Sequence, residues 1–152
     1  MNKKDTVVFD LDGTLLDTLE DLKNSVNYAM TQCGYPEHTL DEVRRYVGNG
    51  ILLLMQRAIP GGKDDPNFDK AFTLFKEHYG KHCNDTTKPY AGIMELLHTL
   101  KENNIKIAIV SNKADFAVKE LNAIYFKDLI LVAIGEKESE GIRKKPAPDT
   151  VI

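Results

Sequence analysis

The segment TVVFDLDGT, at residues 6–14, carries the strongest indication of the fold. Its first part, Thr6 to Leu11, is short, rich in β-branched residues and apolar on both faces, which is typical of a central strand in a parallel sheet. Asp12-Gly13-Thr14 then ends the strand. We therefore predict a buried strand that carries two aspartates to one edge of a sheet.

Asp10 and Asp12 stand at positions i and i+2, so strand geometry points both carboxylates to one side. Two acids this close repel each other unless a cation lies between them. A pair with one ionised and one protonated member suits nucleophile and general-acid roles. Gly13 permits a sharp turn toward an anion, and Thr14 can donate from its hydroxyl and its main-chain amide. The alternative is an ordinary acidic turn, because D-x-D-G also occurs in calcium loops and in turns.

Residues 17–84 carry helical periodicity, with no strand pattern between them. Two capping boxes are predicted at helix starts, one formed by Asp17 with Glu20 and the other by Thr39 with Glu42. The segment is therefore predicted to be an all-helical module.

The pattern changes after this module. The apolar run Ile105 to Val110 is a buried-type strand, Ala114 to Ile124 is a helix, and Leu129 to Ile134 is another strand. Alternation of strand, helix and strand implies a parallel sheet with right-handed crossovers. The predicted fold class is α/β, a doubly wound, Rossmann-like parallel sheet that is incomplete at its C-terminus.

The domain prediction follows from these patterns. Residues 1–16 and 85–152 form a partial core, and residues 17–84 form a helical cap inserted after the first strand. The insertion leaves at the carboxyl end of that strand, where open α/β sheets bind ligands, so the cap is placed to act as a lid. Leu15 to Thr18 and Asp85 to Pro89 are the expected hinges.

Composition narrows the possible functions. Of the 152 residues 42% are hydrophobic and 28% charged, and the net charge is −3, so no bulk basic character recruits nucleic acid or an anionic membrane. Cys33 and Cys83 form no C-x-x-C pair, and two free thiols in a reducing compartment are expected. No apolar run approaches the roughly 18 residues of a membrane span. We expect a cytoplasmic protein, and its oligomeric state is left open.

The histidines and one turn carry weaker signals. His38, His78, His82 and His98 lie in or beside polar helix faces and are interpreted as surface residues. The turn Gly48-Asn49-Gly50 suits a substrate-contacting loop and an ordinary turn between helices equally well.

Three motifs together resemble one family. VVFDLDGTLLDT, at residues 7–18, is similar to the first motif of the haloacid dehalogenase superfamily, and Ser111 in IKIAIVSNK matches the second. Lys145 in KKPAPDT matches the third, in which a lysine precedes a proline; Lys144 has no such neighbour. The segments VGNGILLLMQRAI and PYAGIMELLHTLKENN resemble the phosphoglycolate-phosphatase-like branch.

The resemblance implies a role for each matched residue. Asp10 would attack phosphorus and form an aspartyl-phosphate, and Asp12 would protonate the leaving oxygen and later deprotonate a water. Ser111, with the main-chain amides around Asn112, would hold phosphoryl oxygens, although Ser111 also suits a helix N-cap. Lys145 would neutralise the Asp10 carboxylate and the incoming phosphate.

The resemblance also implies Mg²⁺, which prefers near-octahedral oxygen ligands. Asp10 can supply one from its side chain and Asp12 one from its carbonyl. The family's fourth motif, a glycine-aspartate pair after another strand, is missing, and the only acid after Lys145 is Asp149. We therefore expect a longer natural protein, or an assembly that covers the otherwise bare flank of the first strand.

The leading hypothesis is hydrolysis of a small phosphate monoester, with phosphoglycolate as the best single substrate. A dehalogenase is disfavoured because it needs no general acid at Asp12. A β-phosphoglucomutase-like phosphoryl transfer retains both aspartates and stays open. A non-catalytic fragment or binding protein is the alternative of another class, because the fourth motif is absent.

Overall fold

The computed structural model describes residues 5–137, 140–142 and 144–151. It divides into two compact units, one made of Met1–Asp17 with Lys88–Ile152 and the other of Thr18–Thr87. Within the described residues, no helix has both the length and the apolar character needed to cross a membrane. The assignment of these units as catalytic core and cap stays a prediction.

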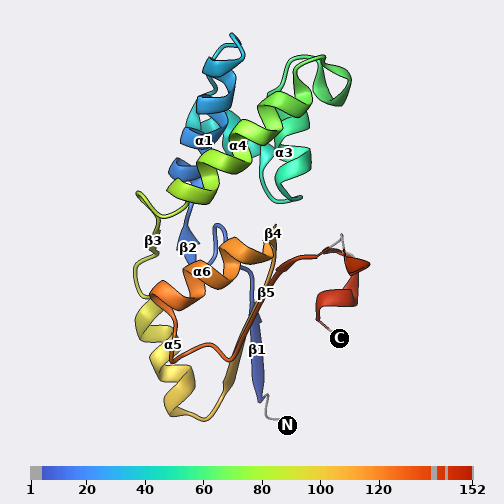
Figure 1. Cartoon of the computed structure of the whole chain (residues 1–152). Coiled ribbons are helices and arrows are strands. Elements are labelled where there is room, and N and C mark those ends of the chain that lie inside the picture. Colours follow the sequence, from blue (N-terminus) through green and yellow to red (C-terminus); the bar gives the residue numbers. More distant parts are fainter. Residues whose placement is uncertain (1–4, 138–139, 143, 152) are drawn as a thin grey trace. The chain divides into compact units, whose positions relative to one another are not determined.

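The first unit is built on a parallel sheet (Figure 1). Its strands are β1 (Thr6–Phe9), β4 (Lys106–Ala114) and β5 (Val132–Glu136), hydrogen-bonded in the order β1-β4-β5. Both pairs run parallel, with Phe9 opposite Ile109. The predicted α/β class with a Rossmann-like parallel sheet is thus confirmed, and in the described part of the chain β1 lies at the edge of this sheet.

One face of the sheet forms the core of this unit. Helices α5 (Ile93–Glu102) and α6 (Asp115–Tyr125) contribute apolar side chains to a single buried cluster with that face. The cluster includes Leu97, Ile107, Ile109, Val118, Leu121, Phe126 and Ala133. On the other face, Val8 and Val132 are about half exposed. A short 3₁₀ helix, Pro148–Thr150, follows near the end of the described chain.

The strand bounds differ from those predicted. β1 stops at Phe9 because the Leu11 carbonyl accepts three amides in a tight turn instead of continuing a ladder. β4 continues past Val110 to Ala114, across an irregular register against β5. Leu129 and Ile130 are not in a strand, because their amides donate to the Phe126 carbonyl in a turn after α6.

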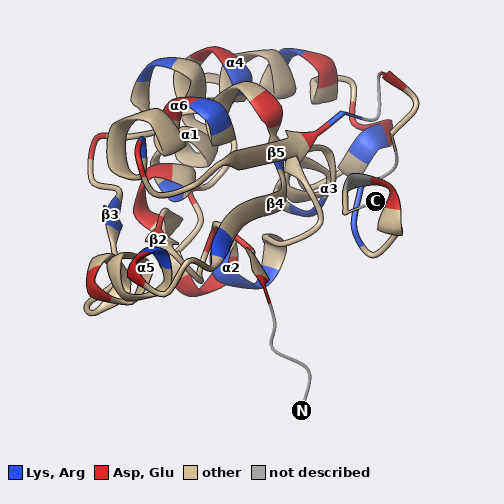
Figure 2. Cartoon of the chain, turned by 90° about the horizontal axis from the view of Figure 1, so that it is seen from below, with Lys and Arg blue, Asp and Glu red and all other residues tan. Residues whose placement is uncertain are grey.

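The second unit is all helical, as predicted. It consists of α1 (Leu19–Gln32), α2 (Leu40–Tyr46), α3 (Ile51–Ala58), the 3₁₀ helix Gly62–Asp64 and α4 (Phe68–His82). Its buried apolar side chains come from every α-helix and include Val26, Met30, Val43, Leu54, Met55, Ala71 and Phe75. Acidic and basic residues alternate along α4 of this unit (Figure 2), whereas the charged residues of α1 lie only near its start.

One of the two predicted capping boxes forms. The Thr39 hydroxyl accepts the Glu42 amide at 3.2 Å, and the Glu42 carboxylate accepts the Thr39 amide at 3.3 Å. The box of Asp17 with Glu20 is wrong: Thr18 is the N-cap of α1 and makes no side-chain cap hydrogen bond. Asp17 instead lies in a short strand.

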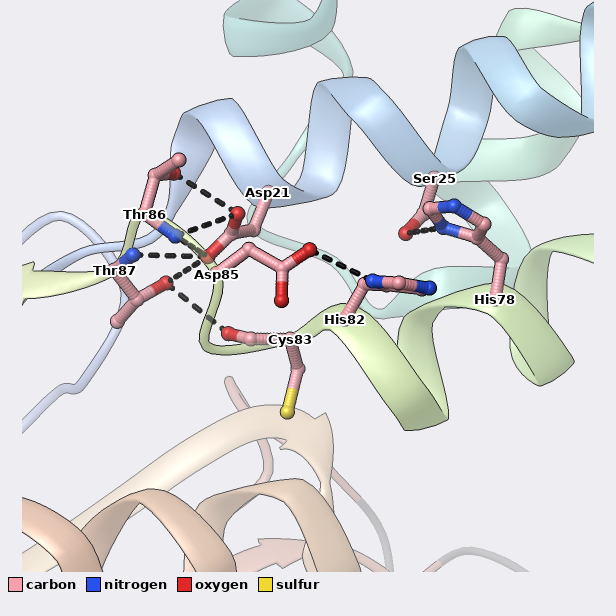
Figure 3. Close-up of polar contacts among 8 residues, drawn as sticks. All are labelled: Asp21, Ser25, His78, His82, Cys83, Asp85, Thr86 and Thr87. Atoms are coloured by element: carbon pink, nitrogen blue, oxygen red, sulfur yellow. Dashed lines mark hydrogen bonds and ion pairs between the residues drawn. The ribbon is translucent and has the colours of Figure 1, made fainter.

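A buried carboxylate joins the two ends of the helical unit (Figure 3). Asp21, in the first turn of α1, is only 1% exposed and accepts hydrogen bonds from the Thr86 and Thr87 amides at 2.9–3.0 Å. Both threonine hydroxyls also donate to it, at 2.9 and 2.7 Å. Just outside this contact, in the first unit, β2 (Leu16–Asp17) pairs antiparallel with β3 (Lys88–Pro89).

Two histidines are more buried than predicted. The His38 side chain is 16% exposed, and its ring nitrogens contact the Glu42 carboxylate and the Ala58 carbonyl. His78 lies beside the buried Ser25 hydroxyl, 2.8 Å from its Nδ1 (Figure 3). The local sequence does not indicate two of these contacts, because Ser25 lies on another helix and the Ala58 carbonyl belongs to the backbone of a distant segment.

Candidate active site

Asp10 lies immediately after β1, at the carboxyl end of the strand. Its Oδ1 accepts hydrogen bonds from the Leu11 amide at 2.8 Å and from the Lys145 ammonium at 3.2 Å. The side chain is 47% exposed, and no described residue donates to its second oxygen, Oδ2. The carboxylate is therefore fixed through one oxygen and accessible through the other, as a nucleophile requires.

The turn after Asp10 uses most of its own amides. The Leu11 carbonyl accepts the amides of Thr14, Leu15 and Leu16 at 3.0–3.2 Å, and the Gly13 amide donates to the Leu16 carbonyl. Gly13 has φ +75°, a conformation that favours glycine. The Thr14 amide is already bonded, so the predicted donation from this amide to an anion finds no support in the structure.

Lys145 reaches the same place from the far end of the chain. Its ammonium donates to the Val110 carbonyl at 2.8 Å as well as to Asp10. The Asn112 side chain holds this segment at both backbone groups: the Lys145 amide donates to Asn112 Oδ1 at 2.8 Å, and Asn112 Nδ2 donates to the Lys145 carbonyl at 3.2 Å. Asn112 thus positions the lysine, a role that the sequence did not suggest.

Ser111 is buried within β4 rather than at a helix start. Its hydroxyl accepts the Lys113 amide at 3.1 Å, and the N-cap of α6 is Ala114. The N-cap interpretation of Ser111 is therefore wrong. A phosphate-binding role for this hydroxyl remains a prediction.

Asp115, the first residue of α6, ties the helix to β5 beside these residues. It accepts the Gly135 amide at 2.8 Å and the Lys119 ammonium at 2.6 Å. Burial raises the pKa of Asp115, but the Gly135 amide and the Lys119 ammonium favour its charged form more strongly, so its pKa lies below the usual range. This ionised carboxylate stabilises the packing of α6 on the sheet.

Lys113 is the site residue that sequence reasoning missed. Its side chain is only 2% exposed, and its ammonium lies 3.0 Å from Oδ1 of Asp12. The available signal was strand alternation: had the strand been extended past Val110, Ser111 and Lys113 would have been assigned to one side of it. Two lysines, one from β4 and one from residue 145, therefore meet the two aspartates.

The donor chemistry around Asp10 and Asp12 suits a hard divalent cation. The Asp10 carboxylate and the Asp12 main-chain carbonyl can supply oxygen ligands, and Mg²⁺ in phosphoryl-transfer sites commonly uses one or two carboxylates with waters and substrate phosphate. Among the described residues, no group of three or more His, Cys, Asp or Glu side chains is arranged to hold a metal ion. The described residues thus offer Mg²⁺ a partial set of oxygen ligands, the Asp10 carboxylate and the Asp12 main-chain carbonyl.

This fold and site define a class: α/β proteins with a parallel sheet and an acidic pair just after the first strand. The chain matches the family model of haloacid dehalogenase-like hydrolases over residues 7–152. It is 36% identical over 113 residues to a phosphoglycolate phosphatase of Thiobacillus denitrificans, covering 72% of this chain and 50% of that protein. A phosphoglycolate phosphatase of Nitrosospira multiformis is 33% identical over 147 residues, covering 93% of this chain and 64% of the relative.

A solved structure agrees with these relatives. The crystal structure of a predicted phosphoglycolate phosphatase from Haemophilus somnus superposes with a TM-score of 0.88 at 28% identity, covering 99% of this chain and 70% of that one. The chain therefore belongs to the haloacid dehalogenase-like hydrolase family, and its resemblance to the phosphoglycolate phosphatase branch is confirmed. It spans about half to two thirds of the length of these two curated relatives.

Proposed function

We propose that this protein is a magnesium-dependent phosphatase acting on a small phosphate monoester, with phosphoglycolate as the first substrate to test. The observation that carries the proposal is the meeting of Asp10 and Lys145. Their side chains lie 3.2 Å apart although 135 positions separate them in the chain. The relatives named phosphoglycolate phosphatase support the choice of substrate.

In the proposed first step, Asp10 Oδ2 attacks the phosphorus and the bond from phosphorus to the leaving oxygen breaks. Asp12 gives its proton to that oxygen, so the alcohol leaves neutral. The Lys145 ammonium, bonded to Asp10 Oδ1, offsets the negative charge of the carboxylate and of the approaching phosphate. The Ser111 hydroxyl and the Thr14 hydroxyl are proposed to bind phosphoryl oxygens.

In the second step, a water attacks the phosphorus of the aspartyl-phosphate while Asp12 takes its proton, and the Asp10 carboxylate is released. General acid and base help of this kind contributes typically about 10²- to 10⁴-fold. Asp10 through its side chain and Asp12 through its carbonyl would hold Mg²⁺, which when bound supplies positive charge to the phosphate oxygens.

We also propose that the protein acts in the cytoplasm. Cys33 and Cys83 are free thiols, which suits a reducing compartment.

The test is hydrolysis of phosphoglycolate and of p-nitrophenyl phosphate by the full natural protein, with and without Mg²⁺. We expect activity that requires Mg²⁺ and that Asp10→Asn abolishes. Asp128→Asn, which alters an exposed acid of the same unit away from the site, is the matched control and should retain activity. Hydrolysis by Asp10→Asn at the wild-type rate would contradict the proposal.

A further inference from the structure

Lys113 is a buried cation directly against the acid of the proposed pair. β4 carries it three residues beyond Val110, in the part of the strand whose register against β5 is irregular. Its side chain is 2% exposed, whereas that of Asp12 is 28% exposed. A lysine is seldom buried to this degree without a specific partner, because desolvation of its charge is costly.

The surroundings of Lys113 fix where its ammonium lies. Its amide donates to the Ser111 hydroxyl. Its carbonyl oxygen lies so close to Gly135 that a Cβ added there would be only 2.5 Å away. The backbone at this position is therefore closely packed on both sides. A side chain that starts from so constrained a backbone, and is itself buried, has few alternative rotamers.

We propose that Lys113 is a positioning residue for Asp12, and this inference rests on the proposed function. The ammonium at 3.0 Å holds Oδ1 of Asp12 and so fixes the rotation of its carboxylate. General acid catalysis depends on such placement, because the acid must lie within hydrogen-bond reach of the leaving oxygen. Lys113 would thus act through Asp12, whereas Lys145 acts on Asp10.

Substrates with different leaving groups distinguish a positioning role of Lys113 from a merely structural one. An alkyl phosphate needs protonation of its leaving oxygen, whereas p-nitrophenolate leaves without it. Because kcat/KM reports events up to the first irreversible step, it isolates transfer to Asp10 from the later hydrolysis. The ratio of kcat/KM for the two substrates, measured on one preparation, is also independent of the fraction of folded enzyme.

The experiment compares Lys113→Met with wild type in the full natural protein, using p-nitrophenyl phosphate and the alkyl phosphate that wild type hydrolyses best. We expect kcat/KM to fall at least about 10-fold further for the alkyl phosphate, a part of the roughly 10²- to 10⁴-fold that general acid catalysis provides. In an Asp12→Asn background, Lys113→Met should leave the ratio unchanged. Lys127→Met, which removes an exposed lysine of the same unit, is the matched control.

Equal losses on both substrates, or a selective loss that persists in the Asp12→Asn background, would overturn the inference while leaving the phosphatase proposal intact. A wild type that hydrolyses neither substrate would overturn the proposed function and this inference with it. If circular dichroism shows that Lys113→Met does not fold, Lys113→Gln replaces it. The same selective loss of kcat/KM on the alkyl phosphate is expected for that variant.

Discussion

The two lysines at the site differ in what they contribute. The pair of Lys145 with Asp10 is partly exposed on both sides, so it stabilises the fold by no more than about 1 kcal/mol. This ion pair therefore contributes little to stability. Its proposed role is to offset the negative charge of Asp10, the nucleophile. Lys113 is buried and lies closer to its partner, Asp12.

At the same scale, Asp21 is the buried acid on which the helical unit depends. Asp21→Ala removes the acceptor for two amides and two hydroxyls of Thr86 and Thr87. We expect the free energy of unfolding to fall by about 2–3 kcal/mol, because the Thr87 donors are buried. Urea denaturation measures this, with the exposed Asp41→Ala as a control that should leave the midpoint unchanged. A midpoint for Asp21→Ala equal to that of wild type would refute the assignment.

Gly135 allows the close approach of β5 to the end of β4. A Cβ at this position would lie 2.4 Å from the Cα of Asp115 and 2.5 Å from the carbonyl oxygen of Lys113, both backbone atoms. Gly135→Ala should therefore destabilise the protein by about 2 kcal/mol or more and displace the site. Gly80→Ala, where a Cβ meets nothing within 4 Å, is the control, and thermal unfolding is the measurement. Equal melting temperatures for the two variants would contradict this account.

The position of a residue in the fold is easiest to predict from the sequence where a single strand carries the information. Asp10 and Asp12 were assigned to the end of the first strand from hydrophobicity alone, and the structure places Asp10 there. The contact of Lys145 with Asp10 came from the motif, because no local pattern connects residues so far apart. The sequence does not indicate Lys113, because the apolar run ends at Val110 whereas β4 continues to Ala114.

Among the helices, α1 and α4 meet at a stack of rings that includes two histidines. His78 stacks between Tyr28 and His82, with centroids 4.5 and 4.3 Å away, and His82 is paired with Asp85. Burial, and then the charge of His82, lower the pKa of His78 below its usual 6.5. The unfolded chain therefore takes up a proton on His78 more readily than the folded chain does.

Stability from this effect is present above pH 6.5 and is lost as the pH falls below it, toward the lower pKa of folded His78. We expect the free energy of unfolding to decline over this window. His78→Gln should reduce the decline, as measured by urea titrations at a series of pH values. An unchanged pH dependence in His78→Gln would show that other groups are responsible.

The helices were the elements that the sequence predicted best. Helical periodicity over residues 17–84 predicted a helical module, and the Thr39 box marked the start of α2 correctly. Asp17 does not cap α1, because it lies in β2 and pairs with Lys88 of β3. This pairing depends on a segment 71 positions later in the sequence, so the local pattern does not predict it. The predicted strand ends were wrong for a related reason. Hydrogen bonds in turns, such as those to the Phe126 carbonyl, cannot be predicted from hydrophobicity.

At the scale of the whole molecule, the chain passes between its two units only at Asp17–Thr18 and Thr87–Lys88. On the helical unit's side of these crossings, the hydrogen bonds of Asp21 join the start of α1 to Thr86 and Thr87. We therefore predict that bending during lid movement is confined to β2 and β3 rather than spread through residues 85–87. Structures with and without bound phosphate would test this. Rotation within residues 85–87, with β2 and β3 unchanged, would contradict it.

The central claim is that Asp10 becomes covalently phosphorylated, and trapping that intermediate tests it most directly. The full natural protein is mixed with Mg²⁺ and substrate, quenched within one turnover and treated with borohydride, which reduces an aspartyl-phosphate to homoserine. Peptide mass spectrometry then locates the reduced residue, with Asp12→Asn used to slow hydrolysis of the intermediate. The account predicts homoserine at position 10, and none in enzyme treated without substrate. Rapid magnesium-dependent hydrolysis with Asp10 unmodified at every quench time would contradict it.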